Sequence, residues 1–150
     1  MASRAFSIED GGLSKVSTSK MTQNREYIDI DLSFAAKGAG DVYKKISVSS
    51  VKQALKNLLL TNRTEKPFSP YFGANLRSYL FELADEYTEN TIRKVIIENI
   101  KAFEKRVDPQ TLKVYTEMDA DNNILTITIV FNVINSTQTE ELTTRLNRLR

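Results

Sequence analysis

Carboxylates and cationic side chains carry nearly all the chemistry that is open to this chain. The 150 residues include 19 Asp and Glu, 21 Lys and Arg, and neither Cys nor His. Disulfides, thiolate nucleophiles, zinc sites built on Cys or His, and imidazole catalysis are therefore excluded. Catalysis would need carboxylates, Lys, Tyr, Ser or Thr. We predict no catalytic residue, no cofactor site and no metal site.

A pair of carboxylates is the enzymatic alternative that stays open. Glycoside hydrolases hold two carboxyl groups about 5–9.5 Å apart, and nothing in the sequence singles out such a pair. Glu98 has apolar neighbours, but helical spacing places it away from the apolar face. The glycines in the first half of the chain lack the strand and helix that surround a phosphate-binding loop. A carboxylate-based peptidoglycan hydrolase is therefore the alternative from another class.

Glu104 and Arg106 are the charged pair with the clearest binding potential. They lie where the longest predicted helix gives way to an extended segment. Residues two apart point the same way in an extended chain, so this pair is suited to a charge-assisted, bidentate link to another subunit. The alternative is two surface charges worth about 0–1 kcal/mol.

The charge balance and the hydropathy argue against nucleic acid and membranes as partners. The formal net charge is +2, whereas a nucleic-acid footprint needs clustered Lys and Arg. The longest wholly apolar runs have three residues, far short of the roughly 20 that a membrane helix needs. Residues 1–10 lack the pattern of a signal peptide, so we expect the chain to stay in the cytoplasm of the cell that makes it, or in an assembly built there.

Composition divides the chain into an arm and one domain. Residues 7–25 are rich in Ser, Thr, Lys, Gly and Asn, with almost no large apolar side chains. Such a segment cannot bury enough surface to offset its ordering entropy. We predict a flexible arm over residues 1–25 and a single domain over residues 26–150.

Hydrophobic periodicity predicts an α+β domain, in which a small mixed or antiparallel sheet packs against helices. An alternating strand is expected at 27–34, with Ile28, Ile30, Leu32 and Phe34 on one face. Helical spacing predicts helices over 47–61, 76–83 and 88–103, and a last helix over 138–149 with Leu142, Leu146 and Leu149 inward. Two further strands, 112–118 and 124–134, should form an antiparallel hairpin around a turn at 120–123.

The strand at 124–134 allows two interpretations, because it is apolar on both faces for much of its length. One is a central strand that is covered on both sides. The other is a sheet edge that accepts a strand from another chain. The candidate residues for such strand exchange alternate along it: Ile124, Thr126, Thr128, Val130, Asn132 and Ile134.

The order and spacing of several motifs resemble one known family. These motifs are Pro67-Phe68-x-Pro70-x-Phe72-Gly73-x-x-Leu76 after Leu58–Thr61, then Leu80-Phe81-Glu82, Glu104-x-Arg106-Val107-Asp108 and Ile129-x-Phe131-x-Val133-Ile134. Together they are similar to the baseplate wedge proteins of contractile-tailed phages, which are often called lysozyme-like. The resemblance covers roughly residues 46–150.

The resemblance implies a structural subunit of the virion's tail baseplate, with a fold like the interaction domain of the tail-sheath subunit. It implies docking and nucleation of the first sheath ring by strand exchange. The implied partners are the tail sheath protein and other wedge subunits, namely a core-bundle subunit and a LysM-like subunit. Pro67, Phe68, Pro70, Phe72 and Gly73 are expected to shape a loop. A platform subunit of a type VI secretion or tailocin-like machine is the alternative within this class.

The family carries a Glu-Pro-Arg motif implicated in contacts with neighbouring wedge components. Here Glu104 and Arg106 match this motif, and Lys105 replaces the proline. Proline would push Glu104 out of helical geometry, so we expect Lys105 to let the helix continue. The resemblance assigns the contact with wedge neighbours to Glu104 and Arg106.

Overall fold

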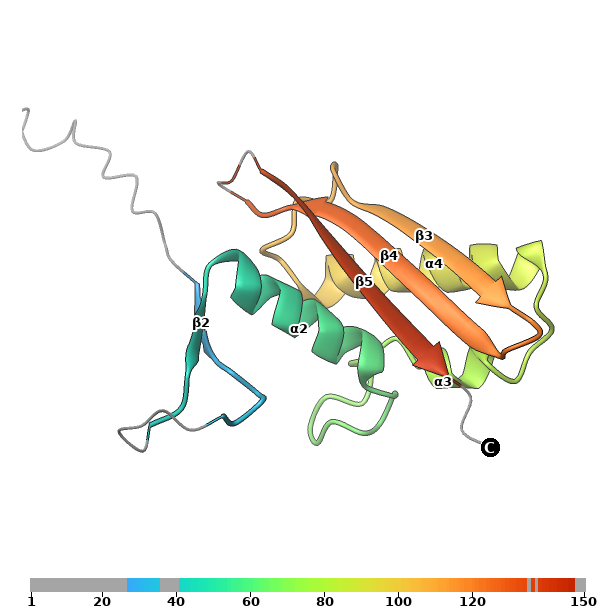
Figure 1. Ribbon diagram of the computed structural model, residues 1–150, viewed down its shortest axis with the longest axis horizontal. Coiled ribbons are helices and arrows are strands. Elements are labelled where there is room, and N and C mark those ends of the chain that lie inside the picture. The colour runs from blue at the N-terminus through green and yellow to red at the C-terminus, as the bar shows by residue number, and fades with distance from the viewer. Residues whose placement is uncertain (1–26, 36–40, 135, 137, 148–150) are drawn as a thin grey trace, which may run out of the picture.

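The fold is a three-stranded antiparallel sheet with two long helices on one face and a separate two-stranded hairpin. The computed structural model describes residues 27–35, 41–134, 136 and 138–147 (Figure 1). The predicted arm over residues 1–25 therefore lies outside the described residues. The elements in chain order are β1 (Ile28–Ile30), β2 (Lys44–Ile46), α2 (Val48–Leu60), α3 (Leu76–Tyr79), α4 (Glu86–Phe103), β3 (Lys113–Asp119), β4 (Ile124–Asn132) and β5 (Thr139–Asn147).

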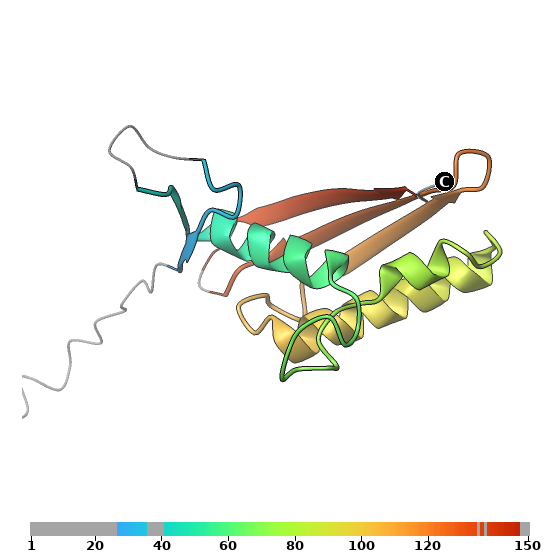
Figure 2. The same cartoon turned by 90° about the horizontal axis from the view of Figure 1, so that it is seen from below.

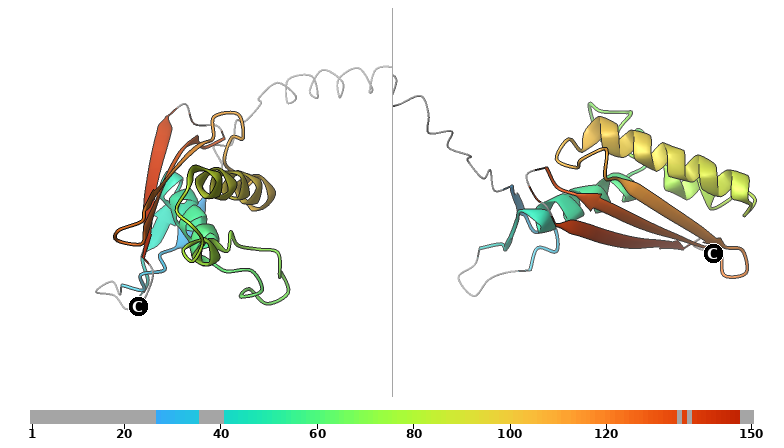
Figure 3. Two further views of the ribbon diagram at one scale, coloured as in Figure 1. Left: turned by 90° about the vertical axis from the view of Figure 1, so that its right-hand side faces the viewer. Right: turned by 90° about the horizontal axis from the view of Figure 1, so that it is seen from above.

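The main sheet has the order β3-β4-β5, with β4 in the centre. Seen along the sheet edge, α2 and α4 lie on the same side of it, and no helix among the described residues covers the other face (Figures 2 and 3). Alternation along β4 follows from this arrangement, because its fully buried side chains all point toward the helices: Leu125, Ile127, Ile129 and Phe131. The predicted α+β class, with a small antiparallel sheet on helices, is confirmed.

The core forms where the apolar stripes of the two helices meet the inner face of the sheet. Each stripe repeats every three or four residues, which is the spacing of one helix face. The buried positions are Val51, Leu55, Leu58 and Leu59 on α2 and Ile92, Ile96 and Ile100 on α4. The helices predicted over 47–61 and 88–103 are both present. The short helix α3 adds Leu76 to the same core.

The prediction of a C-terminal helix is wrong, because residues 139–147 form β5. Leu142 and Leu146 are four residues apart, a spacing that fits one face of a helix and also one face of a strand. Thr144 between them is buried as well, which makes the period two. The β-branched threonines of this segment favour an extended backbone. Leu149 lies outside the described residues.

The prediction of a half-buried apolar face on the N-terminal strand is also wrong. β1 covers only three residues and pairs antiparallel with β2, apart from the main sheet. Ile28 and Ile30 are 57% and 59% exposed. The acidic side chains of the alternate face instead form ion pairs: Asp31 pairs with Lys45 at 3.3 Å, and Asp29 pairs with Arg106 at 3.6 Å.

Candidate functional site

The chain turns directly after α4, although position 105 is lysine and the helix was therefore expected to continue. α4 ends at Phe103, and Glu104 takes a non-helical conformation with φ −117° and ψ 83° while its amide still bonds Ile100. The expectation that Lys105 lets the helix continue is therefore wrong. The reason is electrostatic, since Arg106 folds back onto Glu104 and stabilises the turn without a proline.

Glu104 and Arg106 form a bidentate ion pair within the chain. Nε and one terminal nitrogen of Arg106 donate to the two carboxylate oxygens of Glu104, each over 2.7 Å. The backbone amide of Arg106 donates to the same carboxylate over 3.2 Å. Glu104 is only 8% exposed. The hydrogen bonds that Arg106 donates to Glu104 raise the pKa of Arg106, with burial opposing that shift, so the guanidinium stays charged.

Arg106 also joins the turn to the β1–β2 hairpin. Its second terminal nitrogen lies 3.6 Å from a carboxylate oxygen of Asp29, and its guanidinium lies 5.4 Å from the ring centroid of Tyr27. An arginine over an aromatic face gains a further electrostatic attraction. One side chain therefore connects the end of α4 to the segment that contains β1.

The backbone after the ion pair continues alongside the end of β4. The amide of Ile134 donates to the carbonyl of Arg106 over 2.8 Å, and the amide of Asp108 donates to the carbonyl of Asn132 over 3.0 Å. Val107 and Val133 form an antiparallel bridge between them. The Glu104–Arg106 turn is thus fixed to the centre of the sheet.

The predicted strand-exchange residues do not lie on a free edge. β4 pairs with β5 over its whole length and with β3 from Ile124 to Val130. Beyond Val130, the amide of Asn132 donates to the hydroxyl of Thr111 and its carbonyl accepts the amide of Asp108, so this side of β4 is occupied as well. The side chains of Ile124, Thr126, Thr128, Val130 and Asn132 lie half-buried on the outer face, and Ile134 follows the strand, 42% exposed. The interpretation of this strand as a receiving edge is wrong, because the segment predicted as a helix supplies its second partner.

The outer edge of β3 is partly occupied by α4. The amide of Met118 donates to the side chain of Glu89 over 3.0 Å, and the hydroxyl of Thr116 donates to the backbone carbonyl of Glu89 over 3.2 Å. Polar groups that satisfy a strand edge in this way discourage pairing with another chain. Glu89 therefore closes the edge of β3 near its end.

The outer edge of β5 is open. In an antiparallel ladder the residues alternate between bonding one neighbour and facing the other side. The backbone amide of Met118 points away from β4, toward Glu89. Its partner Leu125 therefore bonds β5, through Leu146. The even-numbered residues of β5 thus bond β4, and the backbone groups of the odd-numbered residues point outward. Within the described part of the chain, no strand pairs with this side of β5. The outward residues are Thr139, Glu141, Thr143, Arg145 and Asn147, all exposed.

A groove of about 530 Å³ lies beside the β5 edge, between β5, α2 and the segment after β1. Leu142 and Leu32 give it an apolar part. Lys52 reaches across to Glu140 of β5 over 2.9 Å. In Figure 1, β5 runs obliquely beside α2. The sequence analysis did not predict the β5 edge and its groove. The pattern that indicates them is the alternation of Leu142, Thr144 and Leu146 with exposed polar residues.

The proline-rich loop contains two structural residues, Phe72 and Gly73, and two exposed aromatic residues, Phe68 and Tyr71. Gly73 has φ +106°, and a Cβ there would overlap the carbonyl oxygen of Thr61. Phe72 packs edge-on against Phe103 with 5.3 Å between ring centroids. Phe68 is fully exposed at a positive φ of 61°, and Pro67 and Pro70 beside it are exposed too. The loop therefore packs on the end of α4 through Phe72 and presents Phe68 to solvent.

The chain is similar to proteins of contractile tails. Its sequence matches the family described as baseplate wedge protein gp25 over residues 47–138. It is 29% identical over 113 residues to the baseplate wedge protein gp25 of Enterobacteria phage T4, covering 75% of this chain and 84% of that protein.

Two solved structures share the fold. A Geobacter sulfurreducens protein described as a candidate tail lysozyme gives a TM-score of 0.59 at 20% identity, covering 67% of this chain and 90% of that one. The baseplate of the anti-feeding prophage contains a chain with a TM-score of 0.57 at 18% identity, covering 80% of this chain and 84% of that one.

These features define a structural subunit of the baseplate of a phage or phage-like contractile tail. The chain belongs to the baseplate wedge protein gp25 family. None of the helices that the structure describes is long and apolar enough to cross a bilayer. Among the described residues, no group of three or more carboxylates is placed to hold a metal ion.

Replacing Arg106 with Ala should destabilise the chain without unfolding it. The change leaves the nearly buried carboxylate of Glu104 with an unpaired charge, and an unsatisfied buried group of this kind costs about 1–3 kcal/mol. Urea unfolding followed by circular dichroism measures the difference. Lys105→Ala is the matched control, because Lys105 is exposed and makes no ion pair among the described residues. Equal stability of the two variants would contradict the structural role of Arg106.

Proposed function

We propose that this chain docks and nucleates the first ring of tail sheath in the baseplate. The observation that carries the proposal is the open edge of β5 in a sheet whose opposite edge is partly closed by Glu89. A strand from a sheath subunit would add to β5 and extend the sheet from three strands to four. Main-chain hydrogen bonds give affinity to such an addition, and side-chain contacts give specificity.

The residues along the β5 edge are suited to this role. The outward side chains are polar or charged, which keeps the free edge soluble before assembly. The groove beside the edge would receive the side chains of an added strand that point toward α2. Glu140, whose side chain is bound to Lys52, belongs to the inner row of β5 and leaves the outer backbone unobstructed.

The Glu104–Arg106 turn is proposed as the contact with other wedge subunits, namely a core-bundle subunit and a LysM-like subunit. The charges of Glu104 and Arg106 neutralise each other within the chain. The pair would therefore affect a partner by fixing the shape of the turn. That shape presents Lys105, which is exposed between them. The contact thus depends on the ion pair through the backbone that it holds.

A second candidate is the equivalent platform subunit of a type VI secretion or tailocin-like machine. The likeness of the fold to the anti-feeding prophage baseplate favours it. The free β5 edge would serve a sheath in either particle, so the same contacts are proposed. The genes beside the coding sequence distinguish the two assignments.

A proline at position 143 should block sheath docking. Proline removes the outward amide of Thr143, which makes no bond within the sheet, and its ring obstructs an added strand. Co-expression with the sheath protein and wedge subunits of the same tail should show loss of sheath and retention of wedge subunits. Thr143→Ala keeps the amide and should bind sheath normally. Normal sheath binding by a folded Thr143→Pro variant would refute the proposed edge, and Glu141→Pro repeats the test at a second outward amide.

We also propose that the chain is not a peptidoglycan hydrolase. Both carboxylate oxygens of the nearly buried Glu104 are occupied by Arg106, so this carboxylate is not free to contact a substrate. Purified protein should therefore fail to clear a peptidoglycan suspension in a turbidity assay with hen egg-white lysozyme as the positive control. Clearing that a single carboxylate substitution abolishes would contradict this assignment.

A further inference from the structure

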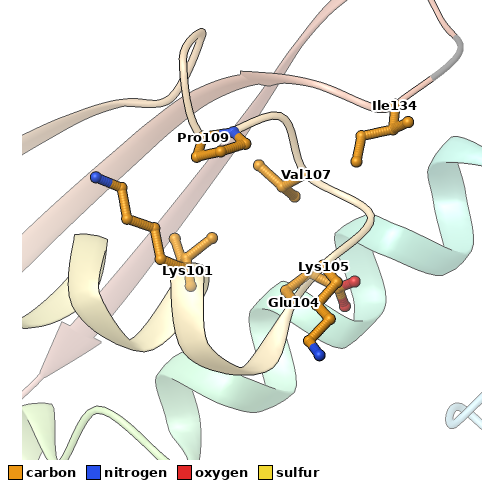
Figure 4. A pocket seen from close by; sticks show the side chains of 7 residues that line it. Lys101, Glu104, Lys105, Val107, Pro109 and Ile134 are labelled. Carbon is orange, nitrogen blue, oxygen red and sulfur yellow. The ribbon is translucent and has the colours of Figure 1, made fainter.

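An apolar pocket of about 310 Å³ lies where α4 ends (Figure 4). Its apolar walls are Ile100 of α4, Val107 and Pro109 of the following turn, and Ile134 after β4. Lys101, Glu104 and Lys105 complete its lining. The pocket is therefore built by the same turn that the Glu104–Arg106 pair holds in place.

The border of this pocket is positively charged. The carboxylate of Glu104 is neutralised by two hydrogen bonds from Arg106. Lys101 and Lys105 are exposed, and neither takes part in an ion pair within the described residues. In Figure 4 their side chains extend away from each other, at two sides of the pocket. One carboxylate oxygen of Asp108, the acidic residue of the same turn, already accepts the amide of Gln110.

We propose that this pocket binds an acidic segment of a neighbouring wedge subunit, which inserts one large apolar side chain between Val107, Pro109 and Ile134. The pocket volume lies at the low end of the roughly 300–1,000 Å³ of small-molecule sites, and it suits a single side-chain anchor of the kind that dominates protein interfaces. Carboxylates beside the anchor would meet Lys101 and Lys105, which orients the segment and speeds its association.

This proposal rests on the proposed contact between the Glu104–Arg106 turn and wedge neighbours. It adds the chemistry of the partner: apolar at the centre and acidic on both sides. It also assigns the specificity to Lys101 and Lys105, which lie outside the Glu104–Arg106 pair itself. The pair fixes the walls of the pocket, and the two lysines select what enters it.

Peptide probes test the chemistry directly on the full chain. Two-dimensional ¹H–¹⁵N NMR would follow titration with the peptide acetyl-Gly-Asp-Glu-Leu-Leu-Glu-Asp-Gly-amide. Shifts should be confined to residues 100–109 and 134, and the peptides with Ala for Leu or Lys for the acids should bind at least tenfold more weakly. Equal binding of the basic peptide, or shifts centred elsewhere, would overturn the proposal.

Charge-reversal variants test the same site in assembly. Lys101→Glu combined with Lys105→Glu should weaken co-purification with the wedge subunits of the same tail at least tenfold, while sheath binding is retained. Lys94→Glu combined with Lys113→Glu changes the net charge equally at exposed positions elsewhere, and should have no effect.

The two levels of the proposal fail in different ways. If no wedge subunit co-purifies with the wild-type chain, the proposed wedge contact is refuted. Normal co-purification by a folded Lys101→Glu, Lys105→Glu variant, with the wild type also binding, would refute the acidic partner alone. Thermal unfolding of both double variants establishes that they are folded.

Discussion

The ion pair between Glu104 and Arg106 is the interaction on which the arrangement of the other elements depends. Its two 2.7 Å hydrogen bonds end α4 and turn the chain back toward the sheet. The same guanidinium reaches Asp29 and the ring of Tyr27, so the hairpin of β1 and β2 is joined to the end of α4. A proline would fix the backbone of such a turn through its ring. In this chain a bidentate ion pair does so, and position 105 is left free to carry a charge.

The second constraint is the difference between the two edges of the sheet. A sheet of three strands has two edges that invite pairing. Glu89 satisfies part of the β3 edge from α4, whereas the β5 edge offers its backbone beside a groove formed with α2. The covered inner face supplies the stability, the open edge supplies the proposed site for sheath, and the turn after α4 supplies the proposed site for wedge neighbours. The three surfaces do not overlap, so one small domain has room for several partners.

Periodicity predicted the core of this fold well and its edges poorly. The stripes of α2 and α4 and the alternation of β4 report burial, which a sequence records directly. The segment 139–147 was predicted as a helix because Leu142 and Leu146 fit both periods, and only the buried Thr144 separates them. That error made β4 seem an edge. The apolar face predicted for the N-terminal strand is the exposed face in the structure. The acidic residues of the other face pair with Lys45 and Arg106, partners that the local pattern does not reveal. The sequence indicated Glu104 and Arg106 as two side chains that face a partner. In the structure they bond each other, because the backbone turns between them.

The sheath protein is proposed to add a strand to the β5 edge. Amide hydrogen exchange, measured by NMR on the full chain alone and with the sheath protein of the same tail, tests it most directly. Without sheath, the outward amides of Glu141, Thr143 and Arg145 should exchange quickly, while the amides of Leu142 and Thr144, bonded to β4, are protected. With sheath bound, all five should be protected. Sheath binding that leaves Glu141, Thr143 and Arg145 exchanging quickly, or that protects Val114 and Thr116 of β3 instead, would contradict the account.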